Sequence, residues 1–254
     1  MIAGLGYAFA EKTIPAIIAR VMYKCALRCV DHVFVLNENN YHILIDRKIV
    51  SESKLIWLRG GEGVDLNRFI FRNLPTNKKP RFLMVTRLLY DKGYSEFVCA
   101  ANNLKNDADF MIMGAIDPRP TAVPLDVIQS DVANNTIKYI AFSPDVISQM
   151  EQADCIVQPS YYEGLSRVLM EACAMGRPVI CSDIPGCREA VEDGVNGFLC
   201  QARNSDSLIS CCKRFIKLTF EQRKAMGYAS RKLAEKKFDE GIVVCRYNDL
   251  ICSE

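Results

Sequence analysis

The sequence has few of the features that mark a metal site, a membrane span or a general nucleic-acid binder. It contains only 2 histidines, and none of its 12 cysteines belongs to a CxxC pair with a matching set of cysteine or histidine partners. No uncharged apolar run reaches the roughly 18 residues that a membrane-spanning helix needs. The 32 basic and 30 acidic residues nearly cancel, so the molecule as a whole has no field that attracts nucleic acid. Any anion-binding site must therefore be local.

The N-terminus also lacks a secretory signature, because "MIAGLGYAFAEK" has no basic segment ahead of its apolar residues and soon reaches Glu11 and Lys12. We therefore expect a cytoplasmic protein. Several cysteines, such as Cys99, Cys155 and Cys181, lie inside apolar runs, where a reduced thiol serves as a small hydrophobic side chain. A metal-binding or disulfide role for the cysteines is the alternative.

Residues 12–29 combine apolar side chains at helical spacing with Arg20, Lys24 and Arg28. The apolar positions are Ile14, Ile17, Ile18, Val21, Met22, Cys25 and Cys29. One interpretation is an ordinary helix that packs its apolar stripe on a core while the cations extend into water. The alternative is a helix that lies on a membrane surface, which would be a peripheral contact at the inner face of the plasma membrane.

Short apolar or β-branched runs alternate with helical patterns, which is typical of parallel βαβ architecture. Two strands, 32–36 and 54–58, with a helix at about 39–47, precede a linker rich in glycine, proline and polar residues. Six predicted strands follow, at 81–86, 110–114, 136–141, 155–159, 178–182 and 197–200, with helices at about 94–104, 144–153 and 165–175. Because two strands cannot form a parallel sheet with both faces covered, we expect one complete doubly wound domain and the remnant of a second.

In an open parallel sheet, ligands bind outside the carboxyl ends of the strands, so the loops that follow the strands are where chemistry is expected. The strand at 81–86 is followed by "RLLYDKG", which contains Arg87 and Lys92. Two cations at a strand end suit a diphosphate, because arginine offers a planar fork and lysine a compact charge. Alternatively, both are surface cations that pair with Asp91 or other acids.

The strand at 155–159 is followed by "SYYEGLSRVLMEACAMG", whose apolar spacing predicts a helix with Ser166 as its cap and Gly176 as its stop. The free backbone N–H groups at the start of this helix favour an anion. Glu163 precedes the helix and Glu171 lies one to two turns inside it, so the two carboxylates have different tasks.

Carboxylates accept hydrogen bonds only, so acids beside an anion site suit a hydroxyl-rich ligand such as ribose or a hexose. The alternative is that Glu163 complements the helix dipole and that Glu171 is solvated or salt-bridged. The loop after 178–182, "SDIPGCREAVEDGVNGF", is rich in turns, and we expect Arg188 and Glu189 to pair within it.

Together these stretches resemble glycosyltransferase family 4, the retaining enzymes of the GT-B fold, and among them bacterial transferases that extend lipid-linked or surface polysaccharide units. The similarity spans essentially the whole chain. Its matching residues are "GLGYAF", "GGEGVDLNRF", "TRLLYDKG" and "ADCIVQPSYYEGLSRVLMEACAMGRPVICSDIPGCREAVEDGVNGFL".

The resemblance implies an α/β fold of the GT-B type with three parts. Residues 1–64 are the remnant of an acceptor-binding Rossmann-like domain, and 65–235 form the nucleotide-sugar domain. Residues 236–254 form a C-terminal helix that crosses back onto the first part.

The resemblance also implies site roles. Arg87 and Lys92 match catalytic cations that bind the donor's diphosphate, and Glu163 matches the acid that contacts the donor sugar. The substrate-binding matches are the backbone N–H groups of Gly164, Leu165 and Ser166, and the ribose-binding acid Glu171.

The implied reaction replaces a nucleoside diphosphate at the anomeric carbon with retained configuration. Arg87, Lys92 and the helix start meet the negative charge that develops on the leaving group, so neither a metal ion nor another cofactor is implied. Asp107 and Asp109 form a DxD pattern, which holds metal in a different glycosyltransferase fold. They precede the strand at 110–114 and thus lie at the edge of the sheet opposite the ligand edge, where we expect a solvated turn.

We therefore expect a metal-independent hexosyltransferase that moves a hexose or HexNAc from a nucleoside diphosphate sugar to a hydroxyl of a glycan or polyprenyl-linked acceptor in surface polysaccharide biosynthesis. Family frequency favours UDP, and no nucleic-acid partner is expected. Family members begin with a whole acceptor-binding domain, so we expect one wall of the cleft to be missing here and transfer to be impaired. Glu62 adds an acid to the linker. The alternatives are a nucleotide-sugar-binding remnant without transfer, and a sugar epimerase on the same fold.

Overall fold

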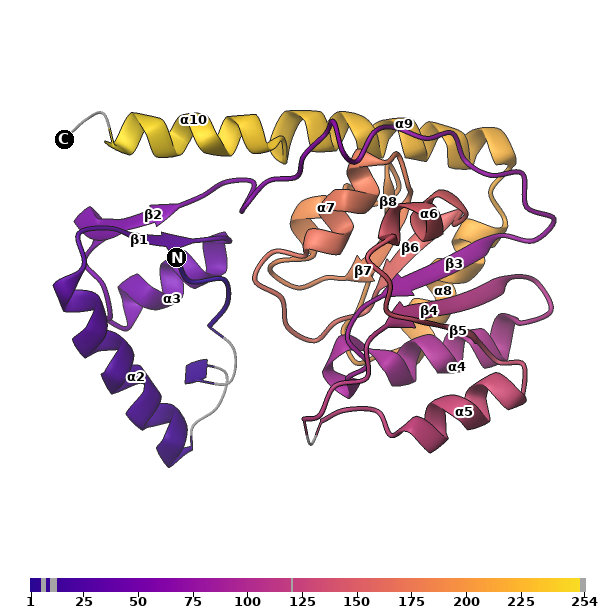
Figure 1. Cartoon of the computed structure of the whole chain (residues 1–254), viewed down its shortest axis with the longest axis horizontal. Coiled ribbons are helices and arrows are strands. Elements are labelled where there is room, and N and C mark those ends of the chain that lie inside the picture. The colour runs from indigo at the N-terminus through magenta and orange to yellow at the C-terminus, as the bar shows by residue number, and fades with distance from the viewer. Residues whose placement is uncertain (6–7, 10–12, 120, 252–254) are drawn as a thin grey trace.

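Figure 1 shows the fold as a computed structural model, which describes residues 1–5, 8–9, 13–119 and 121–251. Gly6 and Tyr7 of the "GLGYAF" match lie outside the described residues, and so do Lys12 of the amphipathic segment and 252–254 of the predicted C-terminal helix. Within the described ranges no helix is both long enough and apolar enough to cross a membrane.

All eight predicted strands are present, and their ends differ from the prediction by no more than two residues. The strands are β1 (Val33–Val35), β2 (Leu55–Trp57), β3 (Arg81–Val85), β4 (Asp109–Gly114), β5 (Lys138–Ala141), β6 (Cys155–Gln158), β7 (Val179–Ser182) and β8 (Gly197–Cys200). Every residue of β6 and β7 is buried, so side chains on both faces of these strands are covered, as the centre of a covered parallel sheet requires.

The helices alternate with the strands. They are α2 (Ile14–Ala26), α3 (Glu38–Asp46), α4 (Tyr94–Leu104), α5 (Leu125–Ala133), α6 (Val146–Glu151), α7 (Arg167–Ala174), α8 (Ser205–Ile216), α9 (Phe220–Lys237) and α10 (Glu240–Ile251). The four helices predicted between strands are confirmed as α3, α4, α6 and α7. Helices α5 and α9 were not assigned from the sequence; the buried side of α9 includes small and polar residues such as Gly227 and Ser230, which weakens its apolar pattern.

Six strands form one parallel sheet in the order β5-β4-β3-β6-β7-β8. The chain starts at β3 in the middle, moves outward through β4 and β5, and returns to add β6, β7 and β8 on the other side. The direction of winding therefore reverses between β3 and β6, which pair directly through Phe82 and Cys155. Loops that leave the carboxyl ends of two such strands diverge to opposite faces and open a crevice.

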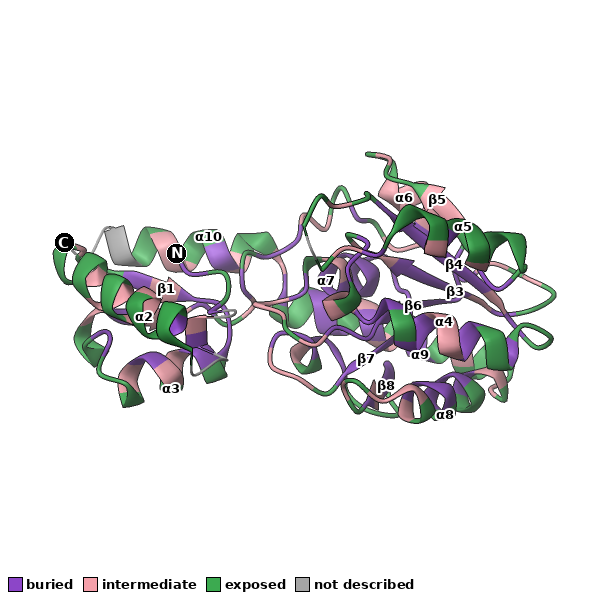
Figure 2. Ribbon diagram, turned by 90° about the horizontal axis from the view of Figure 1, so that it is seen from below, coloured by how far each residue is buried: buried purple, intermediate pink, exposed green. Residues whose placement is uncertain are grey.

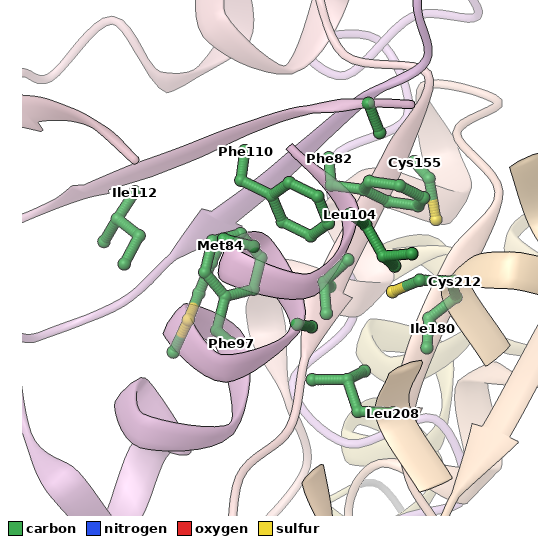
Figure 3. Packing of buried hydrophobic residues seen from close by; sticks show 14 of the residues in the cluster. Phe82, Met84, Phe97, Leu104, Phe110, Ile112, Cys155, Ile180, Leu208 and Cys212 are labelled. Atoms are coloured by element: carbon green, nitrogen blue, oxygen red, sulfur yellow. The ribbon is translucent and has the colours of Figure 1, made fainter. Parts of the chain in front are cut away.

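Hydrophobic cores cover both faces of this sheet. Phe82 and Met84 of β3 point into one core, with side chains of α4 and α8, whereas Leu83 points into the other, with side chains of α7 and α9. Figure 3 shows the first core, in which Phe82, Phe97 and Phe110 pack as neighbouring rings. This two-sided burial makes the six-stranded region a rigid support for the loops at its edge.

The N-terminal segment forms a separate two-stranded parallel sheet of β1 and β2, with one smaller core of its own. In Figure 1, α9 and α10 run end to end along one side of the molecule, so that α10 lies beside this small sheet. The ring centroids of Tyr247, on α10, and Phe34 lie 4.9 Å apart, and Arg246 donates a hydrogen bond to the Arg59 carbonyl. The division of the chain into domains at 64/65 and 235/236 stays a prediction.

The cysteines are largely part of the cores. All eleven that the structure describes are free thiols, and seven of them are buried. Burial raises the pKa of thiols such as Cys173 and Cys200, to about 12 in both cases, which keeps them protonated and unreactive.

Candidate active site

A cavity that contains several predicted site residues lies at the carboxyl edge of β3 and β6, where the winding reverses. Its volume is about 600 Å³. One wall comes from the six-stranded region and includes Arg87, Lys92 and Glu163. The facing wall comes from the N-terminal segment and includes Gly4, Leu5, Phe9, Asn39, Asn40 and Ile43. The N-terminal segment thus lines part of this cavity, and the expectation that one wall of the cleft is incomplete stays a prediction.

Lys92 and Glu163 meet in this cavity although they are 71 residues apart in the sequence. The loop after β3 ends in a short 3₁₀ turn, and Gly93 then adopts a φ of +83° before α4 begins. A Cβ atom at Gly93 would lie 2.2 Å from the Pro159 carbonyl oxygen, so only glycine lets the two loops come this close. As a result, Lys92 Nζ lies 2.7 Å from Glu163 Oε1, in an ion pair whose two side chains are mostly shielded from solvent.

The Glu163 carboxylate is held by more than the lysine. The Ser160 hydroxyl donates to Oε1 at 2.8 Å, and Gln158 Nε2 donates to the same oxygen at 3.3 Å. Gln158 and Ser160 are buried and also hydrogen-bond to each other. Within the part of the chain that the structure describes, these bonds all end on Oε1, which leaves Oε2 to accept from a ligand hydroxyl.

Arg87 lies on the same cavity but is more exposed. Its Nη1 lies 3.6 Å from Asp117 Oδ2, and Asp117 also accepts two hydrogen bonds from the Arg119 guanidinium, at 2.8 and 2.9 Å, and one from its backbone N–H at 3.0 Å. The hydrogen bond from Arg119 is the main cause that lowers the pKa of Asp117 to about 2, and Arg87 adds to it. Both predicted cations thus pair with acids, as the alternative interpretation held, but the acid that holds Lys92 is the candidate Glu163 itself.

Helix α7 begins as predicted, with Ser166 as its cap. The Leu169 N–H donates to the Ser166 hydroxyl at 3.4 Å, and the helix stops at Gly176, whose φ is +73°. However, the Ser166 N–H donates to the Gly186 carbonyl at 2.7 Å. In this structure that N–H is therefore occupied, and the N–H groups of Gly164 and Leu165 are the ones with no hydrogen-bond acceptor among the described residues.

Gly164 is the point where the N-terminal segment touches the site. Asn37 Nδ2 donates to the Gly164 carbonyl, and a Cβ atom at Gly164 would lie 1.5 Å from the Ala3 carbonyl oxygen. A side chain at position 164 would therefore push the two walls apart.

Glu171 does not reach the cavity. It is buried one turn into α7, where Arg167 Nε donates to its Oε1 at 3.1 Å. Burial raises the pKa of the Glu171 carboxyl, and Arg167 opposes that rise. Glu163 and Glu171 thus occupy different environments, and the structure brings Glu163, Lys92 and Arg87 onto one cavity without Glu171.

Two smaller cavities adjoin this site. One, of about 250 Å³, is lined by Glu62, Glu163 and Arg167 among others, so the linker acid faces the cleft. The other, of about 300 Å³, is apolar and lies past Arg87, between the ends of β3 and β4 and the residues Phe142, Val146 and Val168. Gly114 is required beside it, since a Cβ atom there would lie 1.7 Å from the Thr86 carbonyl oxygen.

An arginine that sequence analysis missed supports the cavity wall. Arg203 donates to the Tyr162 hydroxyl at 2.6 Å, and its guanidinium lies over the rings of Tyr161 and Tyr162 at 4.8 and 5.5 Å. Tyr161 in turn donates to Glu96 at 2.8 Å. Arg203 and Glu96, which lie far from Glu163 in the sequence, therefore hold the two tyrosines that precede it.

Two expectations for other loops can be compared with the structure. Arg188 does not pair with Glu189: it pairs with Asp183 at 2.9 Å, because Glu189 turns inward and accepts the Gly186 N–H at 2.8 Å.

Asp107 and Asp109 lie at the amino end of β4, where Asp109 pairs in register with Arg81. They are at the edge of the sheet opposite the cavity, and no group of three or more metal-binding side chains occurs among the described residues.

A family model described as "Glycosyl transferases group 1" matches residues 67–233. This range contains all the predicted site residues and the whole six-stranded sheet.

Two curated relatives cover most of this chain. An N,N'-diacetylbacillosaminyl-diphospho-undecaprenol alpha-1,3-N-acetylgalactosaminyltransferase from Campylobacter jejuni is 26% identical over 97% of this chain and 68% of its own length. The capsular polysaccharide biosynthesis glycosyltransferase CapM from Staphylococcus aureus is 23% identical over 88% of this chain and 62% of its own length. The chain thus spans about two thirds of the length of these relatives.

Solved structures share the fold. HepE from Anabaena, solved in complex with UDP, has a TM-score of 0.85 at 19% identity, over 100% of this chain and 71% of its own. Sucrose-phosphate synthase from Thermosynechococcus elongatus has a TM-score of 0.81 at 20% identity, over 99% of this chain and 67% of its own. These likenesses confirm the predicted fold class, a parallel α/β architecture of the GT-B type.

Proposed function

The chain belongs to the group 1 glycosyl transferases, and from that premise we propose that it transfers a hexose or HexNAc from a nucleoside diphosphate sugar to a hydroxyl of a glycan or lipid-linked acceptor, with retention of configuration. The observation that carries the proposal is the contact between Lys92 and Glu163 at the point where the winding reverses, with Arg87 on the same cavity. A cation pair suits a diphosphate, and a carboxylate held at one oxygen suits a sugar hydroxyl.

One orientation of the donor follows from the residues that line the main cavity and the apolar cavity. We propose that the diphosphate lies between Arg87 and Lys92 and that the sugar hydroxyls bind Glu163 Oε2 and the N–H groups of Gly164 and Leu165. The base then lies past Arg87 in the apolar cavity near Phe142. UDP is the favoured nucleotide, because HepE is described in complex with UDP and with UDP-glucose. Glu171 would bind the ribose after a side-chain movement of Arg167.

The chemistry follows from where charge develops. The bond between the anomeric carbon and the diphosphate oxygen breaks, and its electron pair leaves on the diphosphate. The acceptor oxygen bonds to the anomeric carbon on the same face, and its proton passes to the departing diphosphate. Arg87 and Lys92 stabilise the growing negative charge without a metal ion, since each charge pair about 4 Å apart is worth roughly 4 kcal/mol at an effective dielectric near 20.

The acceptor would enter along the wall formed by the N-terminal segment. That wall offers the amide side chains of Asn39 and Asn40 and the apolar side chains of Leu5 and Ile43. We propose a lipid-linked glycan, because the relative from Campylobacter jejuni is named for a diphospho-undecaprenol substrate. Such a substrate puts the reaction at the cytoplasmic face of a membrane, in the biosynthesis of a surface polysaccharide.

Calorimetric titration with UDP, GDP and ADP sugars tests the donor site. The wild-type chain should bind at least one of them, and Arg87→Ala should weaken that affinity about 10- to 100-fold, because a charge-assisted hydrogen bond to the diphosphate is lost. Arg214→Ala is a matched control, since Arg214 is similarly exposed and pairs with Asp193 at 3.8 Å outside the cavity. An unchanged affinity in Arg87→Ala, or no binding to any nucleotide sugar, would sink the donor-site assignment.

Transfer is measured separately, by mass spectrometry of a lipid-linked acceptor after incubation with the donor that binds. The full proposal is supported if a glycosylated product still forms in the presence of a chelator and no longer forms with the Glu163→Gln variant. Donor binding without any product would leave a nucleotide-sugar-binding protein, and a free epimerised sugar without acceptor would identify an epimerase.

A further inference from the structure

Arg203 has a backbone conformation that its place in the chain does not explain. Three non-glycine residues among those described have a positive φ, namely Lys48, Asn135 and Arg203, at 52°, 53° and 59°. Lys48 and Asn135 are each the second residue after a helix, α3 and α5, where a left-handed residue commonly ends the helix. Arg203 instead lies exposed in the turn between the largely buried strand β8 and helix α8 (Figure 2). A strained residue away from a helix end indicates that its side chain is needed where it lies.

The Arg203 side chain reaches the wall of the active-site cavity from outside. It donates to the Tyr162 hydroxyl at 2.6 Å, and its guanidinium lies over the Tyr161 ring at 4.8 Å. Both tyrosines line the cavity, whereas Arg203 is not among the described residues that line it. Arg203 therefore acts on a ligand in this cavity through the tyrosines.

Tyr162 is held at both ends. Lys92 Nζ, which pairs with Glu163, also donates to the Tyr162 carbonyl at 3.4 Å, and Arg203 holds the hydroxyl. The residue is nevertheless 48% exposed. Because its hydroxyl is bound to a residue outside the cavity, the ring is the part of the side chain that remains to face the cavity. A fixed, exposed ring is a preorganised apolar surface for a ligand.

The neighbouring Tyr161 has a different environment. Its hydroxyl donates to Glu96 of α4 at 2.8 Å. Burial, together with this hydrogen bond, raises the pKa of Tyr161 to about 12. Tyr161 thus anchors the loop to the layer of helices, and Tyr162 is the tyrosine that remains exposed at the cavity.

We propose that the Tyr162 ring packs against the carbon face of the donor's sugar, and that Arg203 is the positioning residue that holds the ring in place. The inference deepens the proposed function, on which it rests for the presence of a sugar beside Glu163. In the proposed orientation the base lies past Arg87, away from Tyr162. Loss of Arg203 therefore weakens binding of the sugar part of the donor and spares the nucleotide part.

Calorimetric titration of the whole chain tests the proposal, with the tightest-binding of the UDP, GDP and ADP sugars and with its parent nucleoside diphosphate. Arg203→Gly removes the guanidinium and relieves the positive φ, so this variant should fold. It should bind the nucleotide sugar about tenfold more weakly and the nucleoside diphosphate less than about threefold more weakly. Lys48→Gly is the matched control, because it also replaces an exposed cation at a positive φ, and both affinities should stay unchanged.

A double-mutant cycle shows whether Arg203 acts through Tyr162. Tyr162→Ala should weaken binding of the nucleotide sugar at least about tenfold, and Arg203→Gly should add less than about twofold to that loss. Tyr162→Phe keeps the ring but removes the hydroxyl that Arg203 holds, so its loss should be smaller than that of Tyr162→Ala. Circular dichroism and thermal unfolding of each variant establish that it is folded.

Two results would overturn the inference while the donor site stands. One is an equal loss of affinity for the nucleotide sugar and the nucleoside diphosphate in Arg203→Gly. The other is a double variant, Tyr162→Ala/Arg203→Gly, in which the two single losses multiply, because Arg203 would then act independently of Tyr162. A wild-type chain that binds no nucleotide sugar would instead overturn the proposed function, and this inference with it.

Discussion

The six-stranded and two-stranded regions both consist of parallel strands packed against helices, but only the six-stranded sheet has a hydrophobic core on each of its faces. The six-stranded sheet has a hydrophobic core on each face and buries even Arg177, whose guanidinium donates to several backbone carbonyl groups. The two-stranded sheet has one small core, and its helix α2 keeps an apolar side in solvent. Among the described residues, the charged groups that line the main cavity come from the six-stranded region, whereas the smaller region supplies backbone, amide and apolar side chains there.

This difference indicates a division of labour. Ion pairs such as Lys92 with Glu163 depend on precise loop positions, which a sheet covered on both faces can hold. The smaller region contacts the site through the close approach of the Ala3 backbone to Gly164, through the packing of Gly61 against the Leu165 side chain, and through hydrogen bonds such as that of Asn37. Experiments at the boundary between the two regions therefore test this division.

The largest effect is expected from Gly164→Ala. The new Cβ atom would lie 1.5 Å from the Ala3 carbonyl oxygen, so the N-terminal segment must move away from the site. We expect a loss of about 1–3 kcal/mol in the free energy of unfolding from overpacking, and a fall of about 100-fold in transfer rate from the displaced wall. Chemical denaturation and the product assay measure the two quantities.

Gly4→Ala is the control for this experiment. It adds a methyl group to the other side of the same contact, where its Cβ atom would be 3.8 Å from the nearest atoms of Gly164. Its free energy of unfolding should change by less than about 0.5 kcal/mol. Equal effects in the two variants would show that the close approach at Gly164 does not hold the two regions together.

A smaller effect is expected from Glu171→Gln. Burial raises the pKa of the Glu171 carboxyl above its ordinary value of 4.5, so ionisation costs more in the folded chain than in the unfolded chain. The stability that the protonated group contributes is complete below pH 4.5 and is lost as the pH rises through the raised pKa. The variant should therefore become more stable relative to the wild type as the pH rises from 4 to 7, which denaturation at a series of pH values measures.

Glu235→Gln serves as the comparison, because Arg231 pairs with Glu235 at the same spacing and at 2.7 Å, but on the surface. It should show almost no pH-dependent difference. If Glu171→Gln behaves in the same way, burial of Glu171 carries no cost in stability. Weaker donor binding in Glu171→Gln than in Glu235→Gln would support the ribose role.

The strands of the six-stranded region could be predicted from the sequence, whereas only some of the side chains at its candidate active site could. Alternation of apolar runs located every strand, and "RLLYDKG" and "SYYEGLSRVLMEACAMG" located Arg87, Lys92 and Glu163 because loops at the carboxyl ends of neighbouring strands converge. Gly93 was a visible signal for the tight turn. Its second role, the close approach to Pro159, depends on a loop 66 residues away and has no local signature.

The missed parts of the site depend on contacts between distant segments. Gln158 was a polar residue in an otherwise apolar strand, which is a usable signal for a buried hydrogen bond to the site. Asp117 and Arg203 reach the site from other loops, and their sequence surroundings do not distinguish them from surface charges. Ser166 was predicted as a cap, but the use of its N–H by Gly186 requires knowledge of the loop after β7.

The central claim is that Arg87 and Lys92 bind the diphosphate of the donor. Titration of the chain with UDP and with UMP tests it most directly, since the two ligands share base and ribose and differ by one phosphate. We expect UDP to bind at least about tenfold more tightly than UMP, and we expect Arg87→Ala/Lys92→Met to abolish this preference while Arg214→Ala/Lys213→Met retains it. Equal affinity of the wild type for UDP and UMP, or a preference that survives in Arg87→Ala/Lys92→Met, would contradict the claim.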